Sequence, residues 1–152
     1  MTSTGDSARS LSVLGDGAFM TALLNVVVPP SVDGKLPGAG ALKLAEQVAT
    51  ALEGDSAVEA GLGAVREAAG TVDGGFAAME LAEQVALVES QAAAHAGLMA
   101  AVTRAVYLAY YQHPAVLVGI GEPGRPRYPE GFVIDPTDPE LLAMLQARAR
   151  RS

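Results

Sequence analysis

The chain contains no cysteine among its 152 residues. Disulfides, thiolate zinc sites, thiolate iron–sulfur sites and cysteine nucleophiles are therefore excluded. It also contains no tryptophan, and aromatic residues make up only 5% of the sequence although half of its residues are hydrophobic. Because much of that hydrophobicity comes from alanine, we expect a shallow core in which helices approach one another closely over small side chains.

Positive charge is scarce as well. Ten lysines and arginines stand against seventeen acidic residues, which gives a net charge of −7. Nucleic-acid binding requires a surplus of basic side chains facing phosphates, so the composition argues against a nucleic-acid partner. The basic cluster of Arg148, Arg150 and Arg151 is expected to complement the negative end of a last helix or to form a frayed tail.

Long hydrophobic runs are also missing. A membrane-spanning helix needs about 20 apolar residues, whereas the longest strong run, ALLNVVVPP, stops at Pro29 and Pro30. We therefore expect no direct membrane insertion. Residues 1–17 contain neither an apolar signal core nor a twin-arginine pair, which predicts a cytoplasmic protein, or a periplasmic one if a leader has been removed.

Helical periodicity dominates the rest of the chain, whose length suits one domain. We expect helices over 18–28, 41–53, 56–70 and 76–112, the last split in two near His95 to Gly97. The expected core-facing residues are Met20, Leu23, Leu24 and Val27, then Leu42, Ala45, Val48, Ala49 and Leu52, then Ala78, Leu81, Val85, Val88 and Ala92, and finally Leu98, Val102, Ala105 and Ala109.

Capping signals refine these boundaries. Ser56 and Glu59 have capping-box spacing at the start of the third helix. Gly61 and Gly63 make that helix either marginal or closely packed. Asp138 followed by Pro139 predicts an N-cap and first turn for a short terminal helix.

No strand signal competes with these helices, so the sequence predicts an all-α protein. The expected architecture is an irregular small helical bundle with a long extended C-terminal arm, rich in proline and glycine, and a short terminal helix. Its divisions are a polar lead-in (1–17), the bundle (18–112), the arm (113–137), and the last helix with its basic tail (138–152).

Several apparent catalytic motifs fail on their context. GIGEPG, at Gly119 to Gly124, matches the dinucleotide fingerprint in spacing, but no strand enters it and no helix leaves it. We interpret it as a turn. PGAGAL at 37–42 is read in the same way, although a phosphate on that helix N-terminus stays open.

The candidate metal-binding and acid–base residues also do not form a recognisable site. Glu80, Glu83 and Glu89 lie near His95 in sequence without the Glu-x-x-His spacing of carboxylate-bridged metal sites. His113 is expected to end the long helix, where its imidazole can interact with the last carbonyls. We therefore predict no catalytic, cofactor-binding or metal-binding residues, and no enzymatic activity in this chain.

The arm is the segment that points to a function. Six prolines fall between Pro114 and Pro139, and an extended proline-rich stretch has little conformational entropy left to lose on binding. Aromatic residues and arginine dominate protein interfaces. The predicted partner-interface residues are Tyr110, Tyr111, His113, Pro114, Arg125, Arg127, Tyr128, Pro129 and Phe132. The alternative is that the tyrosines simply cover the bundle's own core.

The segment AVTRAVYLAYYQHPAVLVGIGEPGRPRYPEGFVIDPTDPELL resembles the C-terminal signature of the gluconate 2-dehydrogenase small-subunit family. The resemblance is carried by Tyr110, Tyr111, Pro114, Val116, Gly121, Pro129, Gly131, Asp138, Leu141 and Leu142. The N-terminal LLNVVVPPSVDGKLPGAGALKLAEQV is similar to the opening of that family at Pro29, Pro30, Pro37, Gly38 and Ala39.

This resemblance implies a non-catalytic small subunit that binds a large FAD-dependent oxidoreductase of the glucose–methanol–choline type. Such enzymes oxidise sugars or other alcohols, and the small subunit assists their stability, maturation or export. FAD is then expected in the partner subunit and no cofactor in this chain. Many members begin with a twin-arginine leader, which this sequence does not show. A free-standing helical binding protein without an oxidoreductase partner is the alternative.

Overall fold

The computed structural model describes residues 12–122 and 138–150 of the chain. These residues are mostly helical and include no strand, which confirms the prediction of an all-α protein. The α-helices are α2 (Gly17–Val27), α3 (Ala45–Leu52), α4 (Ser56–Ala68), α5 (Leu81–Ala94), α6 (Leu98–Tyr110), α7 (Pro114–Gly119) and α8 (Pro139–Ala149). Short 3-10 helices are η1 (Val13–Gly15), η2 (Ala39–Leu42), η3 (Ala69–Thr71) and η4 (Phe76–Ala78).

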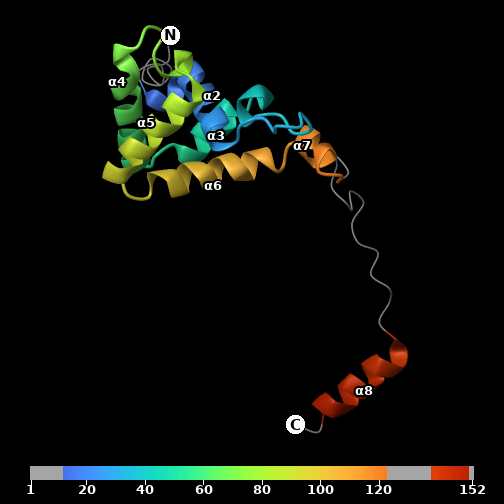
Figure 1. Ribbon diagram of the computed structural model, residues 1–152. Helices are drawn as coiled ribbons and strands as arrows, with labels where there is room; N and C mark the ends of the chain where they lie inside the picture. The colour runs from blue at the N-terminus through green and yellow to red at the C-terminus, as the bar shows by residue number, and fades with distance from the viewer. Residues whose placement is uncertain (1–11, 123–137, 151–152) are drawn as a thin grey trace, which may run out of the picture.

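Helix α2 is the centre of the bundle. It contacts η1, η2, α3, η4, α5 and α6, and α2 to α6 gather into one group while α7 lies at its edge and α8 lies apart from it (Figure 1). The side chains of Met20, Leu23 and Leu24 are completely buried. The Phe19 ring lies 5.1 Å from the Phe76 ring between centroids, which joins η4 to α2.

The limits of α2 follow from its flanking residues. Asp16 caps the helix, since its Oδ1 accepts a hydrogen bond from the Phe19 backbone N–H at 3.1 Å. The helix ends at Val27, two residues before Pro29, because the residue that precedes a proline avoids helical angles. The predicted helix over 18–28 is therefore confirmed to within one residue at each end.

The second helix begins four residues later than predicted. Residues Ala39–Leu42 form η2 instead, and Lys43 follows in a left-handed conformation with φ 56° that breaks the helix. The reason is a close approach of η2 to α2. A Cβ on Gly40 would lie 2.7 Å from the Thr21 carbonyl oxygen, and the Gly40 N–H donates to Asn25 Oδ1 at 3.0 Å. Of the predicted inward residues in α3, Val48 and Leu52 are buried.

The third helix starts at Ser56 as predicted, but its cap is Asp55. The Asp55 carboxylate accepts from the Val58 N–H at 3.2 Å. The helix ends at Ala68, and η3 takes the predicted last turn. Gly61 is buried, and a Cβ there would lie 2.9 Å from Leu98 Cδ2. Close packing against α6 therefore explains this glycine.

The expected division of residues 76–112 into two helices is confirmed. Helix α5 ends at Ala94, and Gly97 (φ 81°) turns the chain into α6. The four predicted core residues of α6 (Leu98, Val102, Ala105 and Ala109) are all buried.

The predicted core face of α5 is wrong, because only Val88 of its five residues is buried and Leu81 is 43% exposed. Residues before Leu81 are not α-helical, and Glu80 and Glu83 form a capping box that fixes where the helix begins. Gln84 is buried in place of the predicted residues, and its Nε2 donates to the Phe76 carbonyl at 2.8 Å. A buried glutamine with a hydrogen-bonded amide thus occupies a position where hydrophobic periodicity would not place a polar side chain.

Alanine substitution at two glycines should distinguish a glycine that is required for close packing from one that only lowers helix propensity. Gly40→Ala should lower the free energy of unfolding by about 1–3 kcal/mol, because its methyl group meets backbone that cannot move aside. Gly63→Ala in α4 has nothing within 4 Å of the new Cβ and should raise stability by up to about 1 kcal/mol through helix propensity. Urea denaturation measures both. Equal effects of the two changes would contradict the close approach of η2 to α2.

Candidate interaction surfaces

The tyrosine pair at the end of α6 is divided between core and surface. Tyr110 is 1% exposed, and its hydroxyl donates to the Pro37 carbonyl at 2.7 Å. Tyr111, one position on, is 49% exposed, because consecutive helical residues point about 100° apart. Tyr110 therefore belongs to the core and has no surface to offer a partner, contrary to its predicted interface role.

Tyr111 belongs to an exposed apolar patch, which we call the tyrosine face and define as Tyr107, Leu108 and Tyr111. These side chains are 45%, 57% and 49% exposed. The Tyr107 and Tyr111 rings meet edge to face with centroids 5.7 Å apart. Tyr111 also lies edge to face against buried Tyr110 at 5.2 Å, so the core supports the patch from beneath. Tyr107 and Leu108 are absent from the predicted interface, although the four-residue spacing of Tyr107 and Tyr111 could have indicated a shared face.

His113 and Pro114 begin a helix that the sequence reading placed in an extended arm. His113 is the N-cap of α7, and its Nδ1 accepts from the Ala115 N–H at 3.2 Å. Pro114 occupies the first helical position, where its missing N–H has no intrahelical partner to lose. His113 therefore starts the next helix and does not cap the end of α6. Pro114 itself is exposed.

Helix α7 rests against the loop that follows α2. A Cβ on Gly119 would lie 2.7 Å from Leu36 Cδ2 and 3.1 Å from the Lys35 carbonyl oxygen, so this glycine is needed for close contact. Its neighbours Val118 and Ile120 are 64% and 49% exposed. Gly121 (φ 85°) then turns the chain. This agrees with our interpretation of GIGEPG as a turn for the residues of that motif that the structure describes, 119–122.

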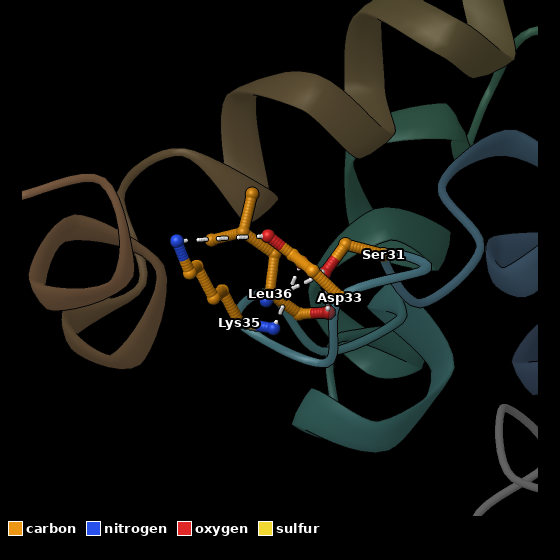
Figure 2. Close-up of polar contacts among 4 residues, drawn as sticks. All are labelled: Ser31, Asp33, Lys35 and Leu36. Carbon is orange, nitrogen blue, oxygen red and sulfur yellow. Dashed lines mark hydrogen bonds and ion pairs between the residues drawn. The ribbon is translucent and has the colours of Figure 1, made fainter.

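The loop itself is held by side-chain hydrogen bonds (Figure 2). The Ser31 hydroxyl donates to Asp33 Oδ1 at 2.7 Å and accepts from the Leu36 N–H at 2.9 Å. The Lys35 N–H donates to Asp33 Oδ1 at 3.1 Å, and the Lys35 ammonium lies 3.9 Å from Asp33 Oδ2. The bonds from Ser31 and then from Lys35 lower the pKa of Asp33 below its ordinary value. The loop thus offers α7 a fixed surface.

The terminal helix carries four of the large exposed apolar side chains among the described residues. Helix α8 begins as predicted, since Asp138 Oδ1 accepts from the Glu140 N–H at 2.9 Å and Pro139 follows. We define its leucine face as Leu141, Leu142, Met144 and Leu145, which are 50%, 48%, 70% and 54% exposed. The helix has no buried residue, so no part of the described bundle covers this face.

The remaining predicted interface residues, Arg125, Arg127, Tyr128, Pro129 and Phe132, lie outside the residues that the structure describes. Their role in a partner interface stays a prediction. Of the nine predicted residues, the structure places Tyr111, His113 and Pro114 together at the junction of α6 and α7, beside buried Tyr110.

A surface groove lies along α2. Its volume is about 640 Å³, and its lining is formed by Gly17, Ala18, Thr21, Ala22, Asn25, Pro30, Ala77, Met79, Leu81 and Gln84. The five α2 residues follow one another at spacings of one, three, one and three, which places them on one side of that helix. The groove therefore has a floor of small side chains and a wall formed by η4 and the start of α5.

Neither a metal cluster nor a membrane span is found within 12–122 and 138–150. No group of three or more histidine, aspartate or glutamate residues there could hold a metal ion. None of the helices in these ranges has both the length and the apolar character to cross a bilayer.

Comparison with known protein families, curated proteins and solved structures gave no match to this chain.

The Tyr110 phenol should make stability fall at alkaline pH. Burial, and then the neighbouring Tyr111, raises the pKa of Tyr110 above its ordinary value of 10.0. A raised folded-state pKa gives stability that is complete below the unfolded-state pKa and is lost as pH rises through the folded-state value. We therefore expect the unfolding free energy of the native chain to fall more steeply above pH 10 than that of Tyr110→Phe. Denaturant titrations from neutral to alkaline pH check this, and parallel curves would contradict it.

At neutral pH the same variant should lose about 1 kcal/mol, because Phe cannot donate to the Pro37 carbonyl.

Proposed function

We propose that this protein is a non-catalytic accessory subunit that binds and stabilises a larger polypeptide. The observation that carries the proposal is the leucine face of α8, four large apolar side chains on one short helix without a buried residue among them. An isolated helix of eleven residues is marginal in water and takes most of its stability from packing of its apolar face. A helix of this kind is therefore suited to a groove on another protein.

The tyrosine face supports the same proposal from a second position. Tyrosine offers a large rigid contact area with a polar end, and it is enriched among residues that dominate binding energy. Tyr107 and Tyr111 are held by their mutual edge-to-face contact and by Tyr110 beneath. They therefore lose little side-chain freedom when a partner covers them.

The partner that we propose is a large FAD-dependent oxidoreductase of the glucose–methanol–choline type, acting on sugars or other alcohols. This part of the proposal rests on the resemblance of the chain to the gluconate 2-dehydrogenase small-subunit family. The motifs that carry it lie in the Pro29 to Ala39 stretch and in the Tyr110 to Leu142 stretch. FAD would then be bound by the partner, and the accessory chain would contribute to the stability or maturation of that enzyme.

Native purification tests the proposal. The chain carrying an affinity tag should be expressed at its natural level in its own host and purified at low salt, and the co-eluting proteins identified by mass spectrometry. We expect one larger protein in fixed ratio, a yellow eluate with flavin absorbance, and dye reduction on addition of sugars or alcohols. The chain purified alone should be colourless.

The outcomes separate the parts of the proposal. A larger partner without flavin would leave the accessory role standing and overturn the oxidoreductase. A monomer with no co-eluting protein would overturn both and favour a free-standing binding protein.

A further inference from the structure

The α2 groove is an open hollow on the described part of the bundle, and the leucine face of α8 is exposed. Helix α8 lies apart from the bundle that holds the groove (Figure 1). We propose that α8 docks in the α2 groove of its own chain whenever no other protein holds it. This inference goes beyond the accessory function, because it concerns the free chain and needs no partner.

The shape of the groove suits a helix. Gly17, Ala18 and Ala22 present almost no side chain, and small residues allow two helices to approach at the short end of the usual 8–10 Å separation. Met79 and Leu81 form an apolar wall beside this floor. On α8, Leu141, Leu142 and Leu145 lie on one side at spacings of three and four, so they can enter the groove together.

Charge at one end of the groove favours one direction for α8. Glu80 and Glu83 flank the wall of the groove at the start of α5, and the Phe19–Phe76 contact joins the η4 part of this wall to the first half of α2. Helix α8 has Glu140 in its first turn and Arg148 in its last. An orientation antiparallel to α2 therefore brings Arg148 towards Glu80 and Glu83.

The tether allows this arrangement within one chain. Gly119 packs against Leu36, so the chain leaves α7 beside the loop that follows Pro30. The 16 steps from Glu122 to Asp138 span up to about 55 Å when extended, which is ample to place the start of α8 at that end of the groove. A helix tethered to the bundle meets the groove at an effective concentration that does not depend on protein concentration, whereas encounter with a second copy becomes rarer as the protein is diluted.

Disulfide trapping tests the proposal directly, because the chain has no native cysteine. Ala22→Cys in the groove floor is combined with Leu145→Cys on the leucine face. The matched control combines Ala22→Cys with Ala147→Cys, which lies on the opposite side of α8. Both pairs are oxidised with glutathione disulfide at low micromolar concentration of the purified full chain, and the products are separated without reductant. All these positions are at least partly exposed, and circular dichroism of the reduced variants verifies their folding.

We expect the Leu145 pair to form an intramolecular disulfide about tenfold faster than the Ala147 pair, as monomer. Arg148→Glu with Arg150→Glu added to the Leu145 pair should slow the reaction, and so should high salt. Equal rates for the two pairs, or disulfide-linked dimers as the main product, would overturn the proposal, the latter in favour of a second copy. Because no partner is present, this result is independent of whether the accessory function holds.

Discussion

Replacement of Tyr110 by alanine should lower the free energy of unfolding of the isolated chain by about 3–5 kcal/mol, the cost typical of a fully buried aromatic ring. Tyr110 is 1% exposed, and its hydroxyl ties the end of α6 to Pro37, 73 positions earlier in the chain. The substitution therefore removes core volume and the bond that fixes the segment after α2. A loss of this size is a large share of the 5–15 kcal/mol by which domains are stable.

Tyr111→Ala is the matched control. The neighbouring ring is half exposed and contributes only edge-to-face contacts with Tyr107 and Tyr110, so its removal should cost less than about 1 kcal/mol of stability. Urea denaturation of both variants, followed by circular dichroism, gives the comparison. Similar losses for the two tyrosines would contradict the division of the pair between core and surface.

Leu141→Ala combined with Leu145→Ala should weaken the complex with the partner by about 2 kcal/mol or more, roughly a thirtyfold rise in Kd. These side chains provide the centre of the leucine face, and no described bundle residue buries them. The bundle should consequently still fold, since its core loses nothing. Titration calorimetry with the partner recovered by native purification measures the change.

The control for this variant replaces Ala143 and Ala147, on the opposite side of α8, by serine. That pair keeps the size and helical character of α8 with the leucine face intact, and its Kd should stay within about twofold of the native value, in line with the energetically near-neutral contacts at most interface positions. An unchanged Kd for the double leucine variant would remove α8 from the proposed interface.

Local signals in the sequence were enough to predict most of the helices. Three signals act through backbone geometry that depends only on neighbouring residues. They are the proline pair after α2, Gly97 between α5 and α6, and Asp138 with Pro139 before α8. The same holds for the buried stripe of α6, where periodicity and burial agree.

Contacts between distant segments explain what the sequence could not predict. The delayed start of α3 depends on the fit of Gly40 against Thr21 and Asn25, in another helix. The predicted buried face of α5 is wrong because the Gln84 side chain donates a hydrogen bond to the Phe76 carbonyl. Hydrophobic periodicity does not predict such a contact. Two adjacent tyrosines look equivalent in sequence, and the structure distinguishes them by the burial of Tyr110 and by its hydrogen bond to Pro37.

The central position of α2 also bears on how the protein is made. The apolar residues of α2 leave the ribosome early. Helix α6, which also packs against α2, is complete only at Tyr110. At 5–20 residues per second, the face formed by Met20, Leu23 and Leu24 waits roughly 4–17 s for its last covering helix. During that interval the nascent chain presents a short aliphatic segment of the kind that chaperones bind. Translation speed through α4 and α5 is therefore expected to influence yield in the cell more than substitutions on their exposed sides.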